Sequence, residues 1–262
     1  MKFDYKTTLK LITSAVILIL IACAVSLITL IFGGSKGDIF VDKTEESDSQ
    51  ASTVTLTETP DYGQNYVNNI IFLGDTTIAG LVDSAVLNDG SDTNQVWSGK
   101  DGDLPLDFSI DKAAIIYPET GKEIPISTAA ENKKPDYILI TLGISNGVSY
   151  CTEESFKAYY GKLITVLEES SPDTKIILQS VLPISKKYEK STSGISSDKI
   201  EIANQWIVEI AENHGVRYLD TASALMDKNG YLKTEFDSGD GLHLSTYGYN
   251  TMLNYIRTHG YK

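Results

Sequence analysis

The sequence carries a hydroxyl group and an acid–base pair in positions that suit acyl transfer. Thr76 follows the apolar stretch Asn69–Leu73 in "FLGDTTIAGL", and Asp240 stands three residues before His243 in "DSGDGLHLSTYGY". A hydroxyl becomes a nucleophile when a neighbouring base takes its proton. A carboxylate at that spacing in a turn can orient an imidazole and stabilise its charged form. We therefore expect Thr76 to attack, His243 to act as the base and Asp240 to orient that base.

Each of these residues also fits a purely structural role. Thr76 alone suits a helix N-cap, and a single histidine such as His243 is common in surface loops. Two further stretches favour the chemical interpretation, because small residues there can offer N–H groups to a developing oxyanion. They are "SGKDGDLP", with Gly99 and Gly102, and "LGISNGVS", with Asn146. Together the four stretches contain the parts that acyl transfer requires.

The elements that position these residues are predicted from short apolar runs that alternate with amphipathic stretches. Apolar residues recur every three or four positions in "EESFKAYYGKLITVLEES" and "SDKIEIANQWIVEIAENHG", which predicts helices, and a last helix is expected near Tyr247–Thr258. Such alternation is typical of a parallel sheet with helices on both faces, which binds ligands at the carboxyl ends of its strands. The predicted strands are Asn69–Leu73, Gln95–Trp97, Tyr137–Leu142, Lys175–Val181 and Arg217–Leu219.

The four stretches resemble the sequence blocks of the SGNH/GDSL esterase and lipase family. Those blocks are named for a Ser in a Gly-Asp-Ser turn, a Gly, an Asn and a His, with an Asp three residues before the His. The resemblance runs from about Ile70 to the end of the chain, and "FLGDT" and "DGLHLS" match best. It implies an α/β fold, namely a three-layer, flavodoxin-like α/β/α sandwich around a parallel five-stranded sheet.

The resemblance also implies roles for the residues of the middle blocks. Thr76 stands where the family has its nucleophilic serine, and its backbone N–H would be one oxyanion donor. Gly102 matches the second block by its distance from the preceding strand, with Gly99 as the alternative. Asn146 matches the third block, although "GISNG" has one more residue after Gly143 than the usual Gly-X-Asn. The predicted oxyanion hole therefore consists of Thr76, Gly102 and Asn146.

Threonine in place of serine is the main departure from the family pattern. The β-methyl group of Thr76 restricts χ1 and crowds the attacking oxygen. A displacement of about 1 Å can lower a rate on the order of 100-fold. We therefore expect a slow esterase, a site reshaped around threonine, or a pocket without turnover. Gly74 and Asp75 are expected to support the turn.

The preferred function is an ester hydrolase that removes acetyl or other short acyl groups from cell-surface glycans. Two alternatives remain open: a non-catalytic relative that binds glycans or acyl groups, and an O-acyltransferase that uses the same site. Trp97, Tyr247 and Tyr249 lie near the predicted site and suit sugar rings, but core packing or helix-cap packing is the preferred explanation for them. The sequence leaves the substrate and the oligomeric state open.

The N-terminal segment predicts attachment to a membrane. Lysines precede an uncharged run at residues 11–32 that is long enough, as a helix, to cross a bilayer with its N-terminus in the cytoplasm. "LIAC" resembles a bacterial lipobox, so a lipoprotein acylated at Cys23 is the alternative. The expected organisation is a cytoplasmic segment (1–10), a signal-anchor helix (11–32), a flexible acidic linker (33–65) and an extracytoplasmic hydrolase-like domain (66–262).

The composition narrows the set of partners. A net charge of −13 argues against nucleic acid, which would repel the chain. The two cysteines, Cys23 and Cys151, are far apart, and the three histidines are scattered, so neither a disulfide framework nor a metal centre is expected. The acyl-transfer residues need no cofactor. The predicted partners are an acylated carbohydrate or small ester and, through residues 11–32, the lipid bilayer.

Overall fold

The protein is built around one parallel sheet. The computed structural model describes residues 53–191 and 193–262. Five strands pair in the order β2-β1-β5-β6-β7, and every neighbouring pair is parallel. They are β1 (Ile70–Gly74), β2 (Val96–Trp97), β5 (Tyr137–Thr141), β6 (Lys175–Gln179) and β7 (Arg217–Leu219). The predicted class and all five predicted strands are confirmed, apart from small shifts at the strand ends.

Each strand contributes to a hydrophobic core on either face of the sheet. Successive side chains point to opposite faces, so Ile71 and Leu73 of β1 join one core while Ile70 and Phe72 join the other. A strand that is buried on both faces has no need of polar residues at alternate positions. This is why "IIFL" and "YILI" are almost continuously apolar.

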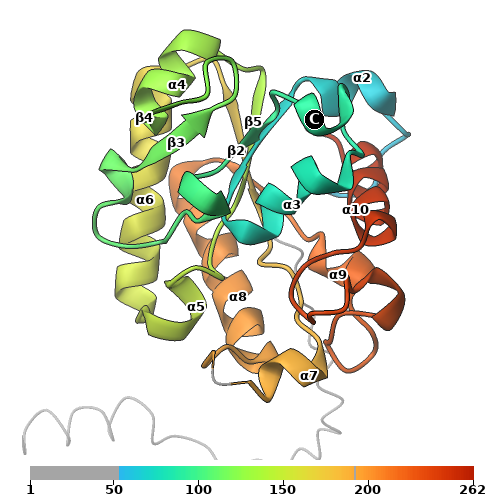
Figure 1. Ribbon diagram of the computed structural model, residues 1–262. Coiled ribbons are helices and arrows are strands. Elements are labelled where there is room, and N and C mark those ends of the chain that lie inside the picture. The colour runs from blue at the N-terminus through green and yellow to red at the C-terminus, as the bar shows by residue number, and fades with distance from the viewer. Residues whose placement is uncertain (1–52, 192) are drawn as a thin grey trace, which may run out of the picture. The chain divides into compact units, whose positions relative to one another are not determined.

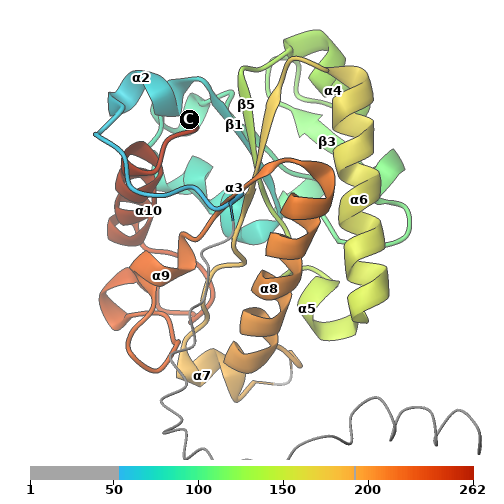
Figure 2. The same ribbon diagram turned by 180° about the vertical axis from the view of Figure 1, so that it is seen from behind.

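Helices cover both faces, which makes three layers (Figures 1 and 2). One face packs against α2 (Gly63–Asn68), α3 (Thr76–Ser84) and α10 (Thr246–Thr258), and the other against α4 (Ile126–Lys133), α6 (Glu153–Ser170) and α8 (Ser197–His214). The connections contain the short helices α5 (Gly147–Tyr150), α7 (Lys186–Glu189) and α9 (Ala222–Leu225). Hydroxyl side chains of Thr152, Ser196 and Ser245 cap the long helices α6, α8 and α10.

A hairpin that the sequence pattern does not predict lies between β2 and β5. Its strands, β3 (Ala114–Tyr117) and β4 (Lys122–Pro125), are antiparallel and form a separate sheet. Strand β4 is mostly exposed, so it lacks the apolar periodicity that identifies the strands of the main sheet.

The folded domain begins earlier than the predicted boundary at residue 66. Thr55 forms a parallel bridge with Tyr218 of β7, and the Leu56 N–H donates to the Tyr218 carbonyl oxygen at 2.8 Å. The side chains of Val54 and Leu56 are buried. Residues 53–65 therefore belong to the domain and not to a flexible linker. The polar composition of these residues does not predict an ordered segment. The segment is ordered because the open edge of β7 supplies the hydrogen bonds and two apolar side chains suffice for packing.

The predicted membrane anchor is not part of the described structure. Within residues 53–191 and 193–262, no helix is long and apolar enough to cross a bilayer. The segments 1–10 and 11–32 and the alternative lipidation site at Cys23 lie outside the described residues. Cys151 is a half-buried free thiol.

Candidate active site

The turn after β1 brings the Thr76 side chain to the carboxyl edge of the sheet. Gly74 ends the strand where a side chain has no room, because a Cβ atom there would lie 2.6 Å from the Thr141 carbonyl oxygen. Asp75 is the N-cap of α3, and its carboxylate accepts a hydrogen bond from the Thr77 N–H at 3.2 Å. Thr76 is therefore the first residue of the helix and not its cap. Its side chain remains available for chemistry.

The Asp75 carboxylate connects two turns of the site. Its Oδ1 accepts hydrogen bonds from the N–H and hydroxyl of Thr77, and its Oδ2 accepts from the N–H groups of Ile144 at 3.0 Å and Ser145 at 3.2 Å. Burial raises the pKa of this carboxyl group, and the four hydrogen bonds oppose the rise. Asp75 thus supports its own turn and also holds the turn after β5 beside it.

Only one of the two adjacent threonines presents its hydroxyl to a cleft. Thr77 is 2% exposed, and its Oγ1 donates to Asp75 Oδ1 at 2.8 Å. Thr76 is half-buried, and the hydrogen bonds of the described residues leave its hydroxyl unused. Burial and hydrogen bonding therefore select Thr76 over Thr77 as the candidate nucleophile.

The predicted acid–base pair is formed. Asp240 Oδ2 lies 2.6 Å from His243 Nδ1. Asp240 Oδ1 accepts the backbone N–H groups of Leu242 and His243, each at 2.9 Å. One carboxylate therefore fixes both the main chain and the ring of His243, and it directs the other ring nitrogen, Nε2, away from itself.

Glycine lets the acid–base turn pack closely against the loop after β6. Gly241 has φ +86°, and a Cβ atom there would lie 2.2 Å from the Ser185 hydroxyl oxygen. The Ser185 N–H donates to the Gly241 carbonyl oxygen at 2.7 Å. Asp237 Oδ1 accepts the N–H groups of Gly239 and Gly241. These contacts fix the position of the turn that carries His243 relative to the sheet.

The Asp240 carboxylate stays ionised across the range in which histidine titrates. Partial desolvation opposes ionisation, but hydrogen bonds from the His243 ring and from the N–H groups of His243 and Leu242 outweigh it and lower the pKa to about 2. A carboxylate beside the ring stabilises the imidazolium that forms when His243 takes a proton. The pair is therefore suited to general-base catalysis.

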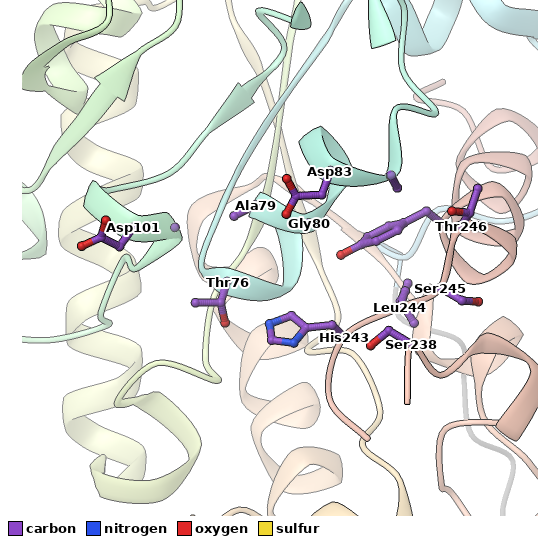
Figure 3. A pocket seen from close by; sticks show the side chains of 13 residues that line it. Thr76, Ala79, Gly80, Asp83, Asp101, Ser238, His243, Leu244, Ser245 and Thr246 are labelled. Carbon is purple, nitrogen blue, oxygen red and sulfur yellow. The ribbon is translucent and has the colours of Figure 1, made fainter. Parts of the chain in front are cut away.

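Thr76 and His243 line one cleft of about 750 Å³. Figure 3 shows the hydroxyl group of Thr76 and the ring of His243 facing each other, with Asp83 and Asp101 farther out. No hydrogen bond joins Thr76 to His243 within the described ranges, so attack requires a small closing movement or a substrate between them. The same ranges contain no group of three or more His, Cys, Asp or Glu side chains that could hold a metal ion.

Tyr249 links the two sides of this cleft. It lies on α10, which follows His243 in the chain, and its hydroxyl donates to the Thr77 carbonyl oxygen on α3 at 2.7 Å. A Cβ atom at Gly80 would lie 2.2 Å from that hydroxyl oxygen. The glycine therefore allows the close approach that sets the position of α10 relative to the nucleophile turn.

The predicted oxyanion donors are only partly in place. The Thr76 N–H lies in the first turn of α3 and has no acceptor in the described part of the chain. Gly102 is close to Thr76, since a Cβ atom on Gly102 would lie 4.0 Å from the Thr76 Cα. The Gly102 N–H, however, donates to the Gly99 carbonyl oxygen at 3.1 Å. Gly102 and not Gly99 lines the cleft. The hydrogen bond from the Gly102 N–H to Gly99 must break before this N–H can bind an oxyanion.

Asn146 is not among the residues that line this cleft, so its role as an oxyanion donor stays a prediction. Asn146 is exposed, has φ +66° and precedes α5 as its N-cap. Counting Gly-X-Asn from Gly143 reaches Ser145, whose N–H is bound to Asp75. The extra residue in "GISNG" therefore places the amide of Asn146 outward. Ser145, and not Asn146, occupies the position that the usual Gly-X-Asn spacing gives to asparagine.

The three aromatic residues near the predicted site have mainly structural roles. Trp97 is fully buried and packs edge-on against Tyr117. Tyr249 is 1% exposed and makes the contact with α3. Tyr247 is exposed but packs its ring on Phe236. Trp97 offers no ring face to a substrate.

Known proteins share the sequence pattern and the fold of this chain. A family model described as "GDSL-like Lipase/Acylhydrolase family" matches residues 72–250, whereas no curated protein matches the sequence. A Streptococcus pneumonia protein provisionally described as a platelet activating factor is 18% identical, with a TM-score of 0.51 over 74% of this chain and 87% of that chain. The periplasmic domain of a Salmonella ser. Paratyphi A lipopolysaccharide acetyltransferase is 18% identical, with a TM-score of 0.49 over 72% and 82%. The first likeness shows the fold alone, and the second is too distant to support an argument.

Replacing Asp75 by Asn should destabilise the domain. The amide keeps one acceptor oxygen but turns its N–H2 group toward two of the four donors that the carboxylate satisfies. Buried donors without partners should lower the free energy of unfolding by about 2–3 kcal/mol. Thermal unfolding followed by circular dichroism should then show Tm lowered by about 5–10 °C. Asp136→Asn, at an exposed aspartate just before β5, is the control, and equal Tm values for the two variants would contradict the role of Asp75.

Asp240 should act through its charge on the His243 ring. The lowered pKa of Asp240, about 2, keeps its carboxylate ionised above that pH. Titration of Asp240 should therefore cause no change in the hydrolysis of a short aryl ester between about pH 5 and 8. Asp240→Asn should leave the fold intact and lower kcat/KM by at least about 100-fold. Unchanged activity in Asp240→Asn would argue against His243 as the base.

Proposed function

Because the chain belongs to the GDSL-like lipase/acylhydrolase family, we propose that it is an ester hydrolase whose nucleophile is Thr76. The Thr76 oxygen attacks the acyl carbon while His243 takes the hydroxyl proton. The bond to the alcohol oxygen breaks as His243 returns that proton to the leaving group. A water molecule, deprotonated by His243, then attacks the acyl–threonine ester. The bond to the Thr76 oxygen breaks as His243 returns the proton to it, and Asp240 stabilises the imidazolium in both steps.

The observation that carries this proposal is the arrangement of Thr76, His243 and Asp240 around one cleft. The hydroxyl and the ring face each other, and the ring is held from behind at 2.6 Å. The Thr76 N–H lies at the positive end of the α3 dipole, where negative charge on the substrate oxygen is stabilised. Nucleophile, base, orienting carboxylate and one oxyanion donor are thus available to a single ester.

The preferred substrate is a short acyl ester on a hydroxyl-rich molecule, such as an acetylated glycan of the cell surface. Beside Thr76 the cleft is lined by small residues, namely Ala79, Gly80 and Gly102. Farther along, it is lined by the hydroxyl side chains of Ser84, Ser238, Ser245 and Thr246. In the described part of the chain the first three already donate a hydrogen bond, whereas the Thr246 hydroxyl is unused. Hydroxyl groups can donate and accept hydrogen bonds, which suits a sugar.

The second candidate is a non-catalytic relative that binds glycans or acyl groups. It is favoured by the hydrogen bond from the Gly102 N–H to Gly99 and by the outward position of Asn146. The loss of one oxyanion donor typically costs about 2.7–4 kcal/mol of transition-state stabilisation. A site with one free donor and a threonine nucleophile is therefore expected to be slow, or to bind without turnover.

We further propose that the hydrolase domain lies outside the cytoplasm, attached by residues 11–32. The support is the uncharged run with lysines ahead of it. A lipoprotein acylated at Cys23 is the alternative form of attachment.

Substitutions at Thr76 should separate the hydrolase from the binding protein. Thr76→Ala should abolish hydrolysis of a short aryl ester, because the attacking oxygen is lost. Thr76→Ser should increase the rate about 10- to 100-fold, because it removes the crowding methyl group and keeps the oxygen; this equals about 1.4–2.7 kcal/mol of barrier. A fluorophosphonate should label Thr76 in the wild type, as mass spectrometry of the modified peptide would show.

The other outcomes are equally informative. An inactive wild type with an active Thr76→Ser variant would support the binding protein. A Thr76→Ser variant slower than the wild type would indicate a turn shaped around the methyl group. Thr76→Ala that hydrolyses at the wild-type rate would remove Thr76 from the mechanism altogether.

The attachment is tested by fractionation of cells that express the full chain. The protein should sediment with membranes and be cleaved by a protease added outside the cytoplasm. Labelled palmitate should be absent from the protein if residues 11–32 span the bilayer. If Cys23 carries the lipid, the label should be incorporated and should be lost in Cys23→Ala. Recovery of the full chain in the soluble cytoplasmic fraction would exclude both forms.

A further inference from the structure

A second, smaller pocket of about 300 Å³ is lined by residues of α5 and of the N-terminal part of α6, among others. We call it the tyrosine pocket. Its lining includes Asp107, Asn146, Tyr150, Cys151, Ser155 and Tyr159. Its volume is at the low end of the range for ligand sites, which suits one small ring better than a large ligand.

One aromatic ring at this pocket is largely exposed. Tyr150 is 80% exposed, although it lines the pocket. Phe108, which follows the pocket-lining Asp107 in the chain, is 72% exposed. Large exposed aromatic side chains are typical of binding surfaces.

Polar groups with unused hydrogen-bonding capacity stand next to these rings. The Asn146 side chain makes no hydrogen bond in the described part of the chain, and its backbone has φ +66°, which asparagine tolerates better than most residues. Asp107 uses Oδ1 to accept from the N–H and hydroxyl of Ser109. The amide of Asn146 and the other carboxylate oxygen of Asp107 remain for a ligand. Neither lysine nor arginine lines the pocket.

The tyrosine pocket shares a loop with the nucleophile turn. The Ser145 N–H donates to Asp75, and the next residue is Asn146. The Leu106 N–H donates to the Ser145 carbonyl oxygen at 3.0 Å, which holds the Asp107 loop against the same segment. A ligand in the pocket would therefore lie next to the loop that Asp75 ties to Thr76.

We propose that the tyrosine pocket binds a neutral pyranose ring of a glycan, and that the acyl ester attacked at Thr76 sits on a neighbouring part of the same glycan. The second clause rests on the proposed function, whereas the first does not. A pyranose has an apolar face of C–H groups, which suits the exposed ring of Tyr150, and a rim of hydroxyl groups, which suits Asn146 and Asp107. The ring of Tyr159 is partly occupied, because the Lys162 ammonium lies 5.9 Å from its centroid. The carboxylate of Asp107 disfavours acidic sugars.

The alkylation rate of Cys151 can measure ligand binding in the pocket, and this measurement does not depend on ester hydrolysis. It lines the pocket, and burial raises the pKa of its thiol, so alkylation by iodoacetamide should be slow and measurable. The full-length chain is treated with iodoacetamide with and without chitotetraose, cellotetraose or xylotetraose, and the Cys151 peptide is quantified by mass spectrometry. At about ten times Kd, a bound sugar that shields the thiol should slow alkylation about tenfold.

Two variants and one control locate the effect. Tyr150→Ala should weaken binding about 5- to 10-fold, and Asn146→Gly, which retains the left-handed turn, should weaken it similarly. For each variant, the rate of Cys151 alkylation with sugar is compared with the rate of the same variant without sugar. Tyr62→Ala, at an exposed tyrosine next to α2, should retain full protection. Thr76→Ala should also retain it, so failure of the ester-hydrolase proposal does not affect this measurement.

Three outcomes would overturn the proposal. The first is an unchanged Cys151 alkylation rate with all three neutral oligosaccharides. The second is equal protection in the wild type and in Tyr150→Ala and Asn146→Gly. The third is protection by an uncharged tetrapeptide such as tetra-alanine but by none of the sugars, which would make the tyrosine pocket a peptide site.

Discussion

The buried carboxylate of Asp75 is the interaction on which the rest of the site depends. A charged group that is 1% exposed is tolerated only when its oxygens are satisfied, and here four donors satisfy them. Two of the donors belong to Thr77 and two to the turn after β5, so the two turns cannot separate without leaving buried polar groups unpaired. The position of Thr76 therefore follows from the electrostatics of its neighbour, and the sheet keeps β1 and β5 adjacent.

The opposite side of the cleft is held by different means. The acid–base turn depends on Asp237, Asp240 and a left-handed Gly241 that packs against Ser185. Tyr249 then connects the helix after this turn to α3 through a single hydrogen bond. Apart from the backbone hydrogen bond from Ser185 to Gly241, these contacts are local or made at the end of one side chain, so this side can adjust more easily than the Asp75 side. Closure of His243 onto Thr76 is expected to come from here.

The site is better arranged for acid–base catalysis than for the stabilisation of an oxyanion. Asp240 is ionised and holds His243 in one orientation. Of the two predicted N–H donors in this cleft, Thr76 and Gly102, only the Thr76 N–H is free of a partner among the described residues. The Gly102 N–H is committed to Gly99 at 3.1 Å, and a substrate oxyanion would have to compete with that carbonyl oxygen. A charged acceptor forms the stronger hydrogen bond, so binding of the transition state can recruit Gly102. Before the Gly102 N–H is recruited, the methyl group of Thr76 determines how well the ester fits next to the attacking oxygen.

The sequence by itself determined the features that depend on neighbours along the chain. The buried strands, the Gly74–Asp75–Thr76 turn and the Asp240–His243 pair follow from apolar runs, turn chemistry and a three-residue spacing. Only the tertiary structure decided that Thr55 pairs with β7, that Asn146 faces outward and that Asp75 reaches Ile144 and Ser145. The physical reason is distance along the chain. Hydrogen bonds between remote segments, and the direction of a side chain after an inserted residue, are set by packing that no local pattern encodes.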